Sequence, residues 1–319
     1  MNKNKDQGDK TPRKKNDELL KGAFEEWFPE FLRFLYPAAD DLFDFEKGLT
    51  FKDKELLAII PDRERRTGKR VADLLVKVFL KDGSEKYILL NTEIEGGDDT
   101  EFAERIYEYN YRIWDRYRIP VATIAVFTGS PNQPRPDAYQ RQILDTTISF
   151  RYRAYHIYGH TEKELLAMDN AFALIVLACQ KASQEGKVPE EELGEDRSAI
   201  ARTMIASGRY GRDRIIAFLM FLKNFIYIKN DKINRKFDSY IYEVTGGTID
   251  MGIIETIRRQ DRQQGREEGK IEGKIEGKQE VVSNLLLATK FSISEIANLA
   301  NVEESFVRKV KADLAKKKN

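Results

Sequence analysis

Three carboxylates have the types and spacing that could support chemistry: Asp73, Glu93 and Glu95. Carboxylate oxygens are the ligands that hard divalent cations such as Mg²⁺ and Mn²⁺ prefer. Three carboxylates brought close together repel one another and take up protons unless a cation neutralises them. The same pattern also occurs on polar, solvated sheet faces, so its meaning depends on the elements that position these residues.

The acidic residues fall on two segments that are typical of a β-hairpin. Residues 71–80 and 86–95 have the alternation of two strands, with an Asp-Gly turn signal between them. Because strand side chains alternate between faces, the even positions form an apolar face and the odd positions carry the acids. A three-residue turn over 82–84 sets Asp73 opposite Glu93, with Cβ atoms about 5 Å apart. A two-residue turn would put the two acids on opposite faces.

Two features distinguish the acidic face from a solvated one. Four of its odd positions are large apolar residues: Leu75, Phe79, Tyr87 and Leu89. Gly96-Gly97 follows Glu95 directly, which ends the strand and lets a ligand approach the backbone closely. Lys77 lies on the same face as Asp73 and adds a cation to it. We therefore expect the acids at one end of a partly covered face, as in a cleft.

Composition limits the class of protein. The chain has 319 residues, enough for a large core and two or three units. Its formal net charge is only +1, so a nucleic-acid partner would have to be bound by local basic patches. No apolar run approaches the roughly 20 residues of a membrane span. The one cysteine, Cys179, excludes a disulfide scaffold, and we expect no membrane partner and a reducing, cytoplasmic location.

Residues 17–160 are predicted to form a compact α/β core. A helical pattern begins at Asp17 and precedes the hairpin, and residues 100–118 form an amphipathic helix. Residues 120–128 are a continuous apolar run, typical of a strand buried on both faces, and a further strand is expected around residues 150–158. Three arginines, Arg105, Arg112 and Arg116, lie beside the apolar stripe of the amphipathic helix. They suit phosphate contacts, but arginines there are also typical of a solvated face.

The flanking segments differ in composition from the core. Residues 1–16 form a basic arm with almost no apolar content, and residues 161–258 have helical periodicity throughout. Residues 259–279 contain the repeat EGKIEGKIEGK, whose glycines and like-charge neighbours make a weak helix. The repeat suits a spacer, or alternatively a helix–helix contact made through the glycines. The helical half is also a candidate surface for homo-oligomer formation.

Residues 280–319 are predicted to form a separate helix-turn-helix-like unit. Ser292 and Glu295 have capping-box spacing, and Asn301 and Glu304 repeat that spacing nine residues later. Two short helices across a tight turn are typical of a helix-turn-helix, and this one ends in basic residues. Because two glutamates at the start of the second helix repel phosphate, both DNA binding and protein binding stay open for this unit.

The two histidines, His156 and His160, lie four residues apart with Gly159 between them. Such a pair can bind a metal when it lies on one face of a helix, but the local pattern is not clearly helical. We therefore interpret both histidines as structural or surface residues.

The hairpin segments RVADLLVKV (70–78) and LLNTEIEG (89–96) resemble the PD-(D/E)XK nuclease superfamily. More narrowly, they are similar to the recombination-promoting nuclease family, whose members are transposase-like. Further segments are similar to that family: residues 17–21, 28–32, 105–117, 120–128 and 251–255 and the EGK repeat. The resemblance covers nearly the whole chain. It implies a central mixed sheet flanked by helices, an all-α C-terminal half and Mg²⁺-dependent cleavage of double-stranded DNA, linked to recombination or mobile-element movement.

The resemblance also implies roles for individual residues. Asp73 matches the hairpin aspartate and Glu93 the second metal-binding acid, while Glu95 falls where the superfamily usually has lysine and this family often has glutamine. A third carboxylate adds negative charge where a cation or neutral donor orients the attacking water. The resemblance also suggests a first-helix acid, for which Glu18 or Asp17 is the candidate. The chemistry of phosphate cleavage adds Lys77 as the missing cation, Lys77 or Lys21 for charge on the transition state, and Arg105 for flanking phosphates.

Two rival interpretations compete with the nuclease, and the first of them follows from the departure at Glu95. The first is a catalytically weak or inactive DNA-binding or regulatory protein on the same fold. The second is a protein-interaction module in which the helical half and the spacer mediate assembly. Mg²⁺-dependent nicking of plasmid DNA separates both from the nuclease.

Overall fold

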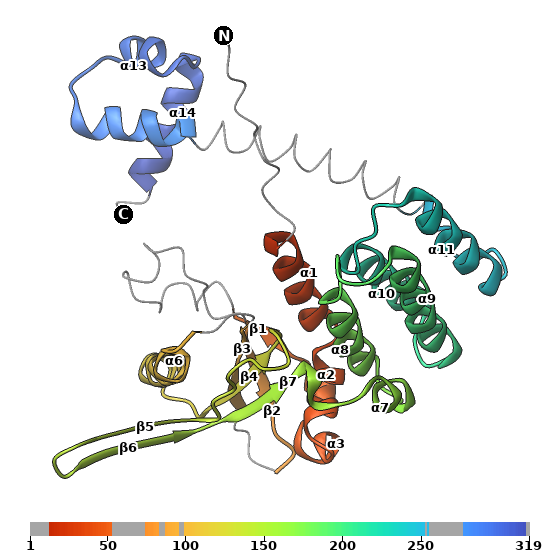
Figure 1. Cartoon of the computed structure of the whole chain (residues 1–319). Coiled ribbons are helices and arrows are strands. Elements are labelled where there is room, and N and C mark those ends of the chain that lie inside the picture. The colour runs from red at the N-terminus through yellow and green to blue at the C-terminus, as the bar shows by residue number, and fades with distance from the viewer. Residues whose placement is uncertain are drawn as a thin grey trace, which may run out of the picture. The chain divides into compact units, whose positions relative to one another are not determined.

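The computed structural model describes residues 13–52, 74–82, 87–95, 99–252, 254 and 277–316. Contacts divide the chain into two compact units, residues 1–240 and 241–319, and each is described by itself (Figure 1). Three sequence predictions concern residues outside the described ones: Asp73, the basic arm through residue 12, and nearly all of the glycine repeat.

A five-stranded mixed sheet lies at the centre of the first unit, in the order β1-β2-β3-β4-β7. Its strands are β1 (Thr50–Phe51), β2 (Leu74–Phe79), β3 (Tyr87–Glu95), β4 (Val121–Phe127) and β7 (Arg153–His156). β1, β2 and β3 run antiparallel to their neighbours, whereas β3, β4 and β7 are parallel to one another. The mixed α/β class predicted from the sequence is therefore confirmed.

The register of β2 with β3 has the parity that a three-residue turn predicts. Leu74 pairs with Thr92, and Phe79 pairs with Tyr87. Odd residues of β2 therefore lie opposite odd residues of β3, as the hairpin interpretation requires. The predicted pair of Asp73 with Glu93 falls one position beyond the described part of β2.

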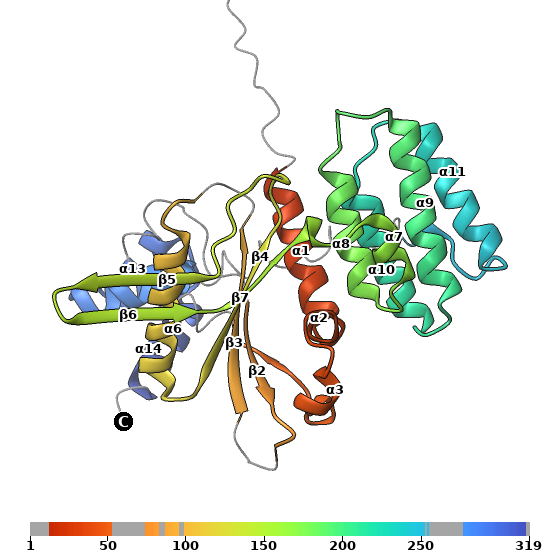
Figure 2. The same ribbon diagram turned by 60° about the horizontal axis from the view of Figure 1, so that its bottom comes forward.

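Helix α6 (Phe102–Tyr117) covers one face of the sheet, as the amphipathic pattern predicts (Figure 2). Leu75, at an odd position of β2, packs with Tyr109 and Ile113 of α6. A second cluster on this face contains Phe102, Ile106, Ala125, Phe127 and Tyr152. On this face, Leu75 of β2 and Ala125 and Phe127 of β4 are thus buried beneath α6.

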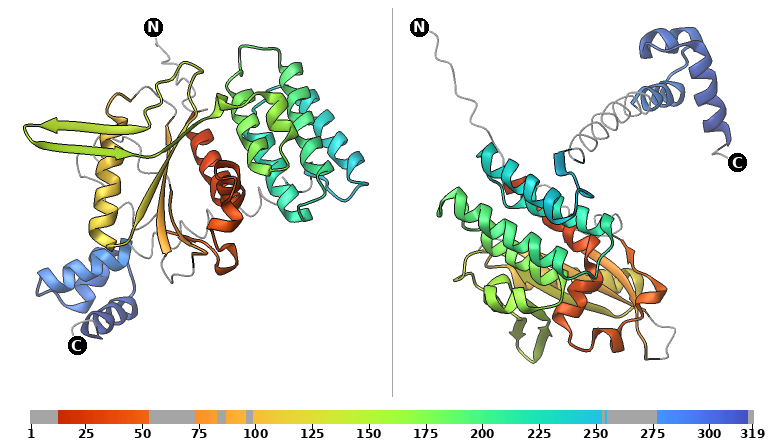
Figure 3. Two further views of the ribbon diagram at one scale, coloured as in Figure 1. Left: turned by 90° about the horizontal axis from the view of Figure 1, so that it is seen from below. Right: turned by 90° about the vertical axis from the view of Figure 1, so that its right-hand side faces the viewer.

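The opposite face is covered by helices from the N-terminal segment, α1 (Arg13–Glu26), α2 (Phe28–Leu35) and α3 (Ala39–Leu42) (Figure 3, left). The ring of Phe28 contacts that of Phe51 in β1, with centroids 5.7 Å apart. The helical pattern from Asp17 is divided into α1 and α2 at Trp27, and Pro29 lies in the first turn of α2. Proline is tolerated there because the first N–H groups of a helix have no intrahelical acceptor.

Five helices follow the sheet. They are α7 (Glu162–Ala167), α8 (Ala171–Ala182), α9 (Glu190–Ala206), α10 (Arg212–Phe225) and α11 (Asp231–Val244). Every residue of α8 from Ala171 to Gln180 is buried, so this helix is the core of the helical region. Helix α8 packs on α2, and α10 packs on α1, so these helices share one unit with the sheet.

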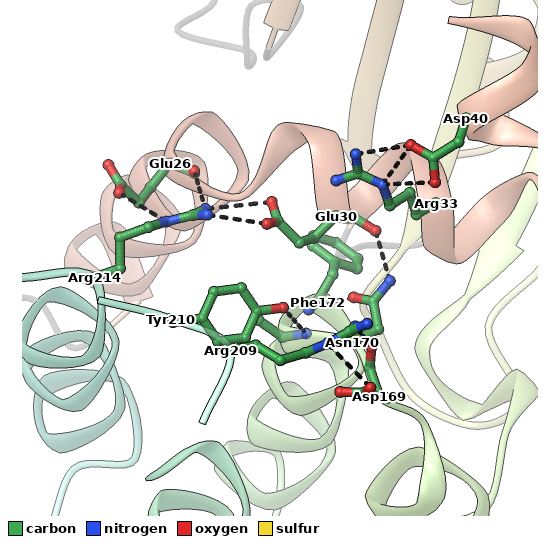
Figure 4. Close-up of polar contacts among 11 residues, drawn as sticks. Glu26, Glu30, Arg33, Asp40, Asp169, Asn170, Phe172, Arg209, Tyr210 and Arg214 are labelled. Carbon is green, nitrogen blue, oxygen red and sulfur yellow. Dashed lines mark hydrogen bonds and ion pairs between the residues drawn. The ribbon is translucent and has the colours of Figure 1, made fainter. Parts of the chain in front are cut away.

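A group of polar contacts joins α1 and α2 to the helical region (Figure 4). The Arg214 guanidinium donates to the carboxylate of Glu30 at 3.0 Å and lies 3.9 Å from the ring centroid of Trp27. The Asn170 side chain caps α8 through the Phe172 N–H and also donates to the Glu30 carbonyl at 3.0 Å. Segments 184 residues apart in sequence are therefore held together at Glu30.

Strands β5 (Ala138–Ile143) and β6 (Thr146–Arg151) form a separate two-stranded sheet, here named the β5–β6 ribbon. The ribbon extends past α6 and away from the five-stranded sheet (Figures 1 and 2). The sequence predicts one strand around residues 150–158, whereas the structure has the end of β6 and then β7 in this region. β5 was not predicted, because a solvent-exposed ribbon needs no apolar alternation.

The second unit contains a helical stretch over residues 277–288, α13 (Ile293–Ala300) and α14 (Glu304–Lys316). The predicted capping box of α13 is confirmed: the Glu295 N–H donates to Ser292 Oγ, and the Ser292 N–H donates to the Glu295 carboxylate at 2.7 Å. Asn301 does not cap α14 as predicted. It ends α13 in the left-handed conformation, with φ of 50°, which asparagine adopts more readily than most residues.

A buried cluster of Val282, Ile296, Ala297, Val307 and Val310 holds these three helices together. Within the described ranges, no helix is long and apolar enough to cross a membrane.

Candidate active site at the carboxyl edge of the sheet

Positions 93 and 95 lie at the end of β3, beside its parallel neighbour β4. Glu93 pairs with Ala125, and Glu95 pairs with Phe127, the last residue of β4. Phe127 in turn pairs with His156, the last residue of β7. Three parallel strands therefore end together at one edge of the sheet. In open α/β sheets, the carboxyl edge of parallel strands is where ligands bind.

The predicted metal site lies partly outside the described residues. The structure gives the backbone register of Glu93 and Glu95 but not their side chains, and it does not describe Asp73. The partners of Glu93 and Glu95 in β4, Ala125 and Phe127, belong to the cluster that packs against α6. The two acid positions thus share a register with residues on the face that α6 covers.

Arg105 supplies a positive charge beside this edge, at the start of α6. Its guanidinium forms an ion pair with Asp99 and lies 5.2 Å from the ring centroid of Phe102. Both charged side chains are mostly buried, with 15% and 20% of their surface exposed. Because Asp99 follows β3 by only a few residues, the paired charges lie on the chain segment that leaves the acid positions.

Lys77 lies away from the acid positions. Its Cα pairs with Leu89, which precedes Glu93 by four residues and so lies about 13 Å from it along β3. Its ammonium group lies 4.8 Å from the ring centroid of Phe79, further from position 73 along β2. The structure therefore directs this cation toward the opposite end of the strand from the acids.

The accessory residues predicted on the first helix lie on the other side of the sheet. Glu18 is exposed on α1, and Lys21 forms an ion pair with Glu25 at 3.9 Å. α1 lies on the face opposite α6 (Figure 2). On α6 itself, Arg112 is half-buried and Arg116 is exposed. Among the basic residues predicted on these helices, Arg105 is the nearest in sequence to Glu93 and Glu95. The others are Lys21, Arg112 and Arg116.

Two residues of the loop after β4, Gln133 and Arg135, lie at the carboxyl edge and were missed by the sequence interpretation. His156 is 4% exposed, accepts a hydrogen bond from Arg135 at Nδ1 (3.1 Å) and donates from Nε2 to the Ser130 carbonyl (3.1 Å). Arg135 can only donate, which fixes this tautomer of His156. The Gln133 side chain accepts from the Gly129 N–H at 2.7 Å and holds the same loop. One feature of the sequence could have identified these residues: segment 128–137 directly follows a buried parallel strand, where ligand-binding loops commonly lie.

His160 has a different partner, the Tyr155 hydroxyl at 3.1 Å. The two histidines therefore make separate structural contacts, as the sequence interpretation expects.

Acidification should weaken the loop that His156 holds. Burial, with a contribution from Arg135, lowers the pKa of His156 from its ordinary value of 6.5. Below about pH 6.5 the unfolded chain then binds more protons at this residue than the folded chain, so stability falls as the pH falls. We expect the thermal unfolding midpoint of the wild type to drop more between pH 7.5 and pH 5.5 than that of His156→Gln, which keeps an acceptor and a donor.

The matched control for this pH dependence is His160→Gln, which removes the other histidine. It should retain the wild-type dependence. Equal slopes for the wild type and His156→Gln would contradict the assignment.

Within the described ranges, no group of three or more His, Cys, Asp or Glu side chains is placed to hold a metal ion. The side chains of the three predicted acids are not among those that the structure describes. No family model matches this chain, and searches of curated proteins and of solved structures find no match either. The likeness to the recombination-promoting nucleases thus stays a prediction carried by the segments quoted above.

Proposed function

We propose that residues 17–160 form a metal-dependent DNA endonuclease that hydrolyses phosphodiester bonds, with Asp73 and Glu93 as ligands of Mg²⁺ or Mn²⁺. One observation carries the proposal. The register of β2, β3 and β4 has the parity that the hairpin interpretation requires, and Glu93 lies at the carboxyl edge of three parallel strands. A role in recombination or mobile-element movement and a cytoplasmic location are part of the same proposal.

The chemistry of the donor set fits a hard cation. Asp73, Glu93 and Glu95 offer only carboxylate oxygens, which suit Mg²⁺ and Mn²⁺ better than softer metals. When bound, such an ion polarises a phosphate oxygen and lowers the pKa of a coordinated water. Glu95 would add a third negative charge beside the attacking water and so disfavour the approach of the phosphate.

Arg105 is the residue we assign to the charge that develops on the phosphate. The superfamily position held by lysine is occupied here by Glu95, so the site needs a cation from another element. Lys77 is about 13 Å from position 93 along the strand, beyond the reach of its side chain to a shared phosphate. Arg105 lies on the segment that leaves β3, and a guanidinium can bind phosphate through two hydrogen bonds.

The direct test is nicking of supercoiled plasmid DNA by the purified full chain. We expect relaxed and linear products with Mg²⁺ or Mn²⁺ and none when EDTA is added. Absence of metal-dependent nicking with both ions would contradict the proposed activity.

The alternative is a catalytically weak or inactive DNA-binding or regulatory protein, which the third carboxylate at Glu95 favours. Glu95→Gln separates the two functions, because it removes one negative charge and supplies a neutral donor at a nearly identical volume. We expect nicking by Glu95→Gln to exceed that of the wild type by about tenfold, the size of a typical charge–charge contribution of 1.4 kcal/mol. DNA retention without nicking in both proteins would favour the alternative.

The second unit has features that suit DNA binding. α14 exposes Arg308, Lys309 and Lys311, although Arg308 pairs with Glu304 at 3.2 Å. A groove of about 760 Å³ beside the turn into α14 is lined by residues that include Lys278, Phe306 and Lys309. We expect deletion of residues 280–319 to lower DNA retention at physiological salt while leaving metal-dependent nicking measurable. Unchanged retention would contradict the helix-turn-helix role.

A further inference from the structure

The β5–β6 ribbon is anchored to α6 at its base. The Tyr139 ring stacks on Tyr107 of α6, with centroids 5.2 Å apart, and the Tyr139 hydroxyl donates to Glu104 at 3.1 Å. Phe150, the register partner of Tyr139, lies 5.6 Å from the same Tyr107 ring. Beyond this anchor the ribbon continues past α6 (Figure 2). A two-stranded hairpin is marginally stable in water by itself, so its far end calls for a surface to pack against.

The ribbon tip, Ile143 to Asp145, presents apolar side chains to solvent. Ile143 pairs with Thr146, which leaves Leu144 and Asp145 as the turn. Leu144 is 89% exposed and has a φ of +52°, and Ile143 is 57% exposed. Hairpin turns normally place glycine or asparagine at positive φ, because a side chain there costs free energy. A leucine at this position serves neither the turn nor the core, and local backbone strain of this kind is typical of contact sites.

A second exposed apolar surface lies on the outer side of α6. Tyr111 is 53% exposed and Trp114 is 42% exposed, and their rings lie 6.3 Å apart. They follow Tyr107 by four and seven residues, so they continue the same stripe of the helix on which the ribbon base packs. The inner side of α6 is buried against the sheet through a separate apolar stripe. A helix that is apolar on two opposite sides is expected to pack against something on each.

We propose that two copies of this chain associate through these surfaces, with the ribbon tip of each copy packed on Tyr111 and Trp114 of the other. The contact is isologous, so a two-fold axis generates it twice. The chemistry repeats what the ribbon base already makes with Tyr107 in its own chain. This surface is distinct from the helical half, which is the candidate assembly region from the sequence.

Charges beside the two surfaces are complementary. Asp145 adjoins Leu144 at the tip, while the Arg118 guanidinium lies 4.7 Å from the Trp114 ring centroid and is 65% exposed. Arg118 bonds to Asp115 within its own helix, but exposed ion pairs of this kind contribute little and exchange readily. Packing of Leu144 on Trp114 of the other copy would bring Asp145 next to Arg118.

The exposed apolar area of the ribbon tip and of Tyr111 and Trp114 is sufficient for a dimer interface when the contact occurs twice. Full side-chain areas of about 150–250 Å², scaled by the exposed fractions, give on the order of 400 Å² of apolar surface per copy from these four side chains. A standard interface buries about 800 Å² per partner, with roughly this apolar share. A single tip contact would be too small to hold two chains together.

Nucleic acid fits these surfaces less well than a second copy does. A two-stranded ribbon can enter the major groove of DNA. The ribbon carries little net charge, however, because Arg141 and Arg151 are opposed by Asp145, which leaves +1 over residues 138–151. The outer side of α6 also carries Glu104 and Glu108, which repel phosphate.

Leu144→Gly is the informative variant, because glycine accepts a positive φ without strain. Its fold should therefore be as stable as that of the wild type, judged by thermal unfolding at dilutions where both chains are monomeric. In sedimentation equilibrium we expect a dimer of the wild type at micromolar concentration. Losing a buried leucine from each copy should raise the dimer dissociation constant about a hundredfold. The matched control, Tyr227→Ala, removes a side chain that is 55% exposed elsewhere on the same unit and should leave the dimer intact.

Two variants, each with one added cysteine, test which residues of the two copies are in contact. A mixture of Leu144→Cys and Trp114→Cys chains should form a disulfide-linked heterodimer on mild oxidation, because the two residues come within disulfide distance only between copies. Cys179 is buried and does not compete. Pairing Leu144→Cys with Arg116→Cys, on a different side of α6, should give no such product.

Three results would overturn the proposal. One is a wild-type chain that stays monomeric at micromolar concentration. Another is a dimer that Leu144→Gly leaves unchanged, which would place the interface on another surface such as the helical half. A third is a monomer whose DNA retention falls in Leu144→Gly, which would assign the ribbon to nucleic acid.

Discussion

Asp73→Ala and Glu93→Gln should each reduce metal-dependent plasmid nicking by at least about a hundredfold, because each removes a ligand whose ion supplies several kcal/mol to the transition state. Glu93→Gln replaces one carboxylate oxygen by an amide nitrogen at constant volume, and position 93 lies within the backbone ladder with β4. The fold should therefore survive the change, and the far-ultraviolet circular dichroism spectrum should match that of the wild type.

Three comparisons make this result specific. Glu101→Gln alters an exposed acid that begins α6 without a side-chain cap, so it should retain wild-type nicking. Raising the Mg²⁺ concentration should partly restore Glu93→Gln if the loss arises from weaker metal binding. Nicking that persists in Asp73→Ala at the wild-type rate would exclude the proposed metal site and point to a contaminating nuclease.

Arg214→Leu should destabilise the first unit by about 2 kcal/mol, which lowers its thermal midpoint by about 4–8 °C. The variant leaves the Glu30 carboxylate, which is only 9% exposed, without its guanidinium partner, and it removes the stacking on Trp27. Breaking a fully buried pair costs about 3–5 kcal/mol, and the lower figure here reflects an arginine that is 36% exposed.

A double-mutant cycle separates the ion pair from the packing. Glu30→Leu combined with Arg214→Leu should cost less than the sum of the single variants, because no unpaired charge stays buried. The control is Arg209→Ala, which breaks an exposed pair with Asp169 at 3.1 Å and should cost about 0.5 kcal/mol. Strict additivity of the Glu30 and Arg214 variants would contradict the role given to the buried pair.

The parts of the fold that local patterns determine could be predicted from the sequence. Alternation predicted the two strands, and a three-residue turn over 82–84 predicted their parity, which the two-residue alternative would have reversed. The spacing of Phe102, Ile106, Tyr109 and Ile113 identified the buried stripe of α6. The Ser292 capping box likewise depends on residues three apart.

The parts that depend on distant contacts could not be predicted. Glu30 and Arg214 are separated by 184 residues, and nothing in either local pattern indicates the other. The bond between Arg135 and His156 has the same character. The prediction for Lys77 was wrong for a different reason. Lys77 lies on the predicted face of the strand, but a strand rises about 3.3 Å per residue, so a residue four positions from Asp73 is too far from the acids to share a phosphate with them. Sharing a face of a strand is therefore not enough to assign a residue to a site, because the residue must also lie close to the site along the strand.

α8 packs on α2 and α10 packs on α1, and this packing limits which segments of the gene can recombine with other genes. Phe172 of α8 lies 4.8 Å from Phe24 and 4.9 Å from Phe31, measured between ring centroids. A gene fragment ending near residue 160 would encode the whole sheet but would remove Phe172 and expose Phe24 and Phe31 to water. The segment that must be inherited together is thus larger than the segment that carries the acids. A recombination event that transfers the sheet to another gene must also transfer the helices through α10.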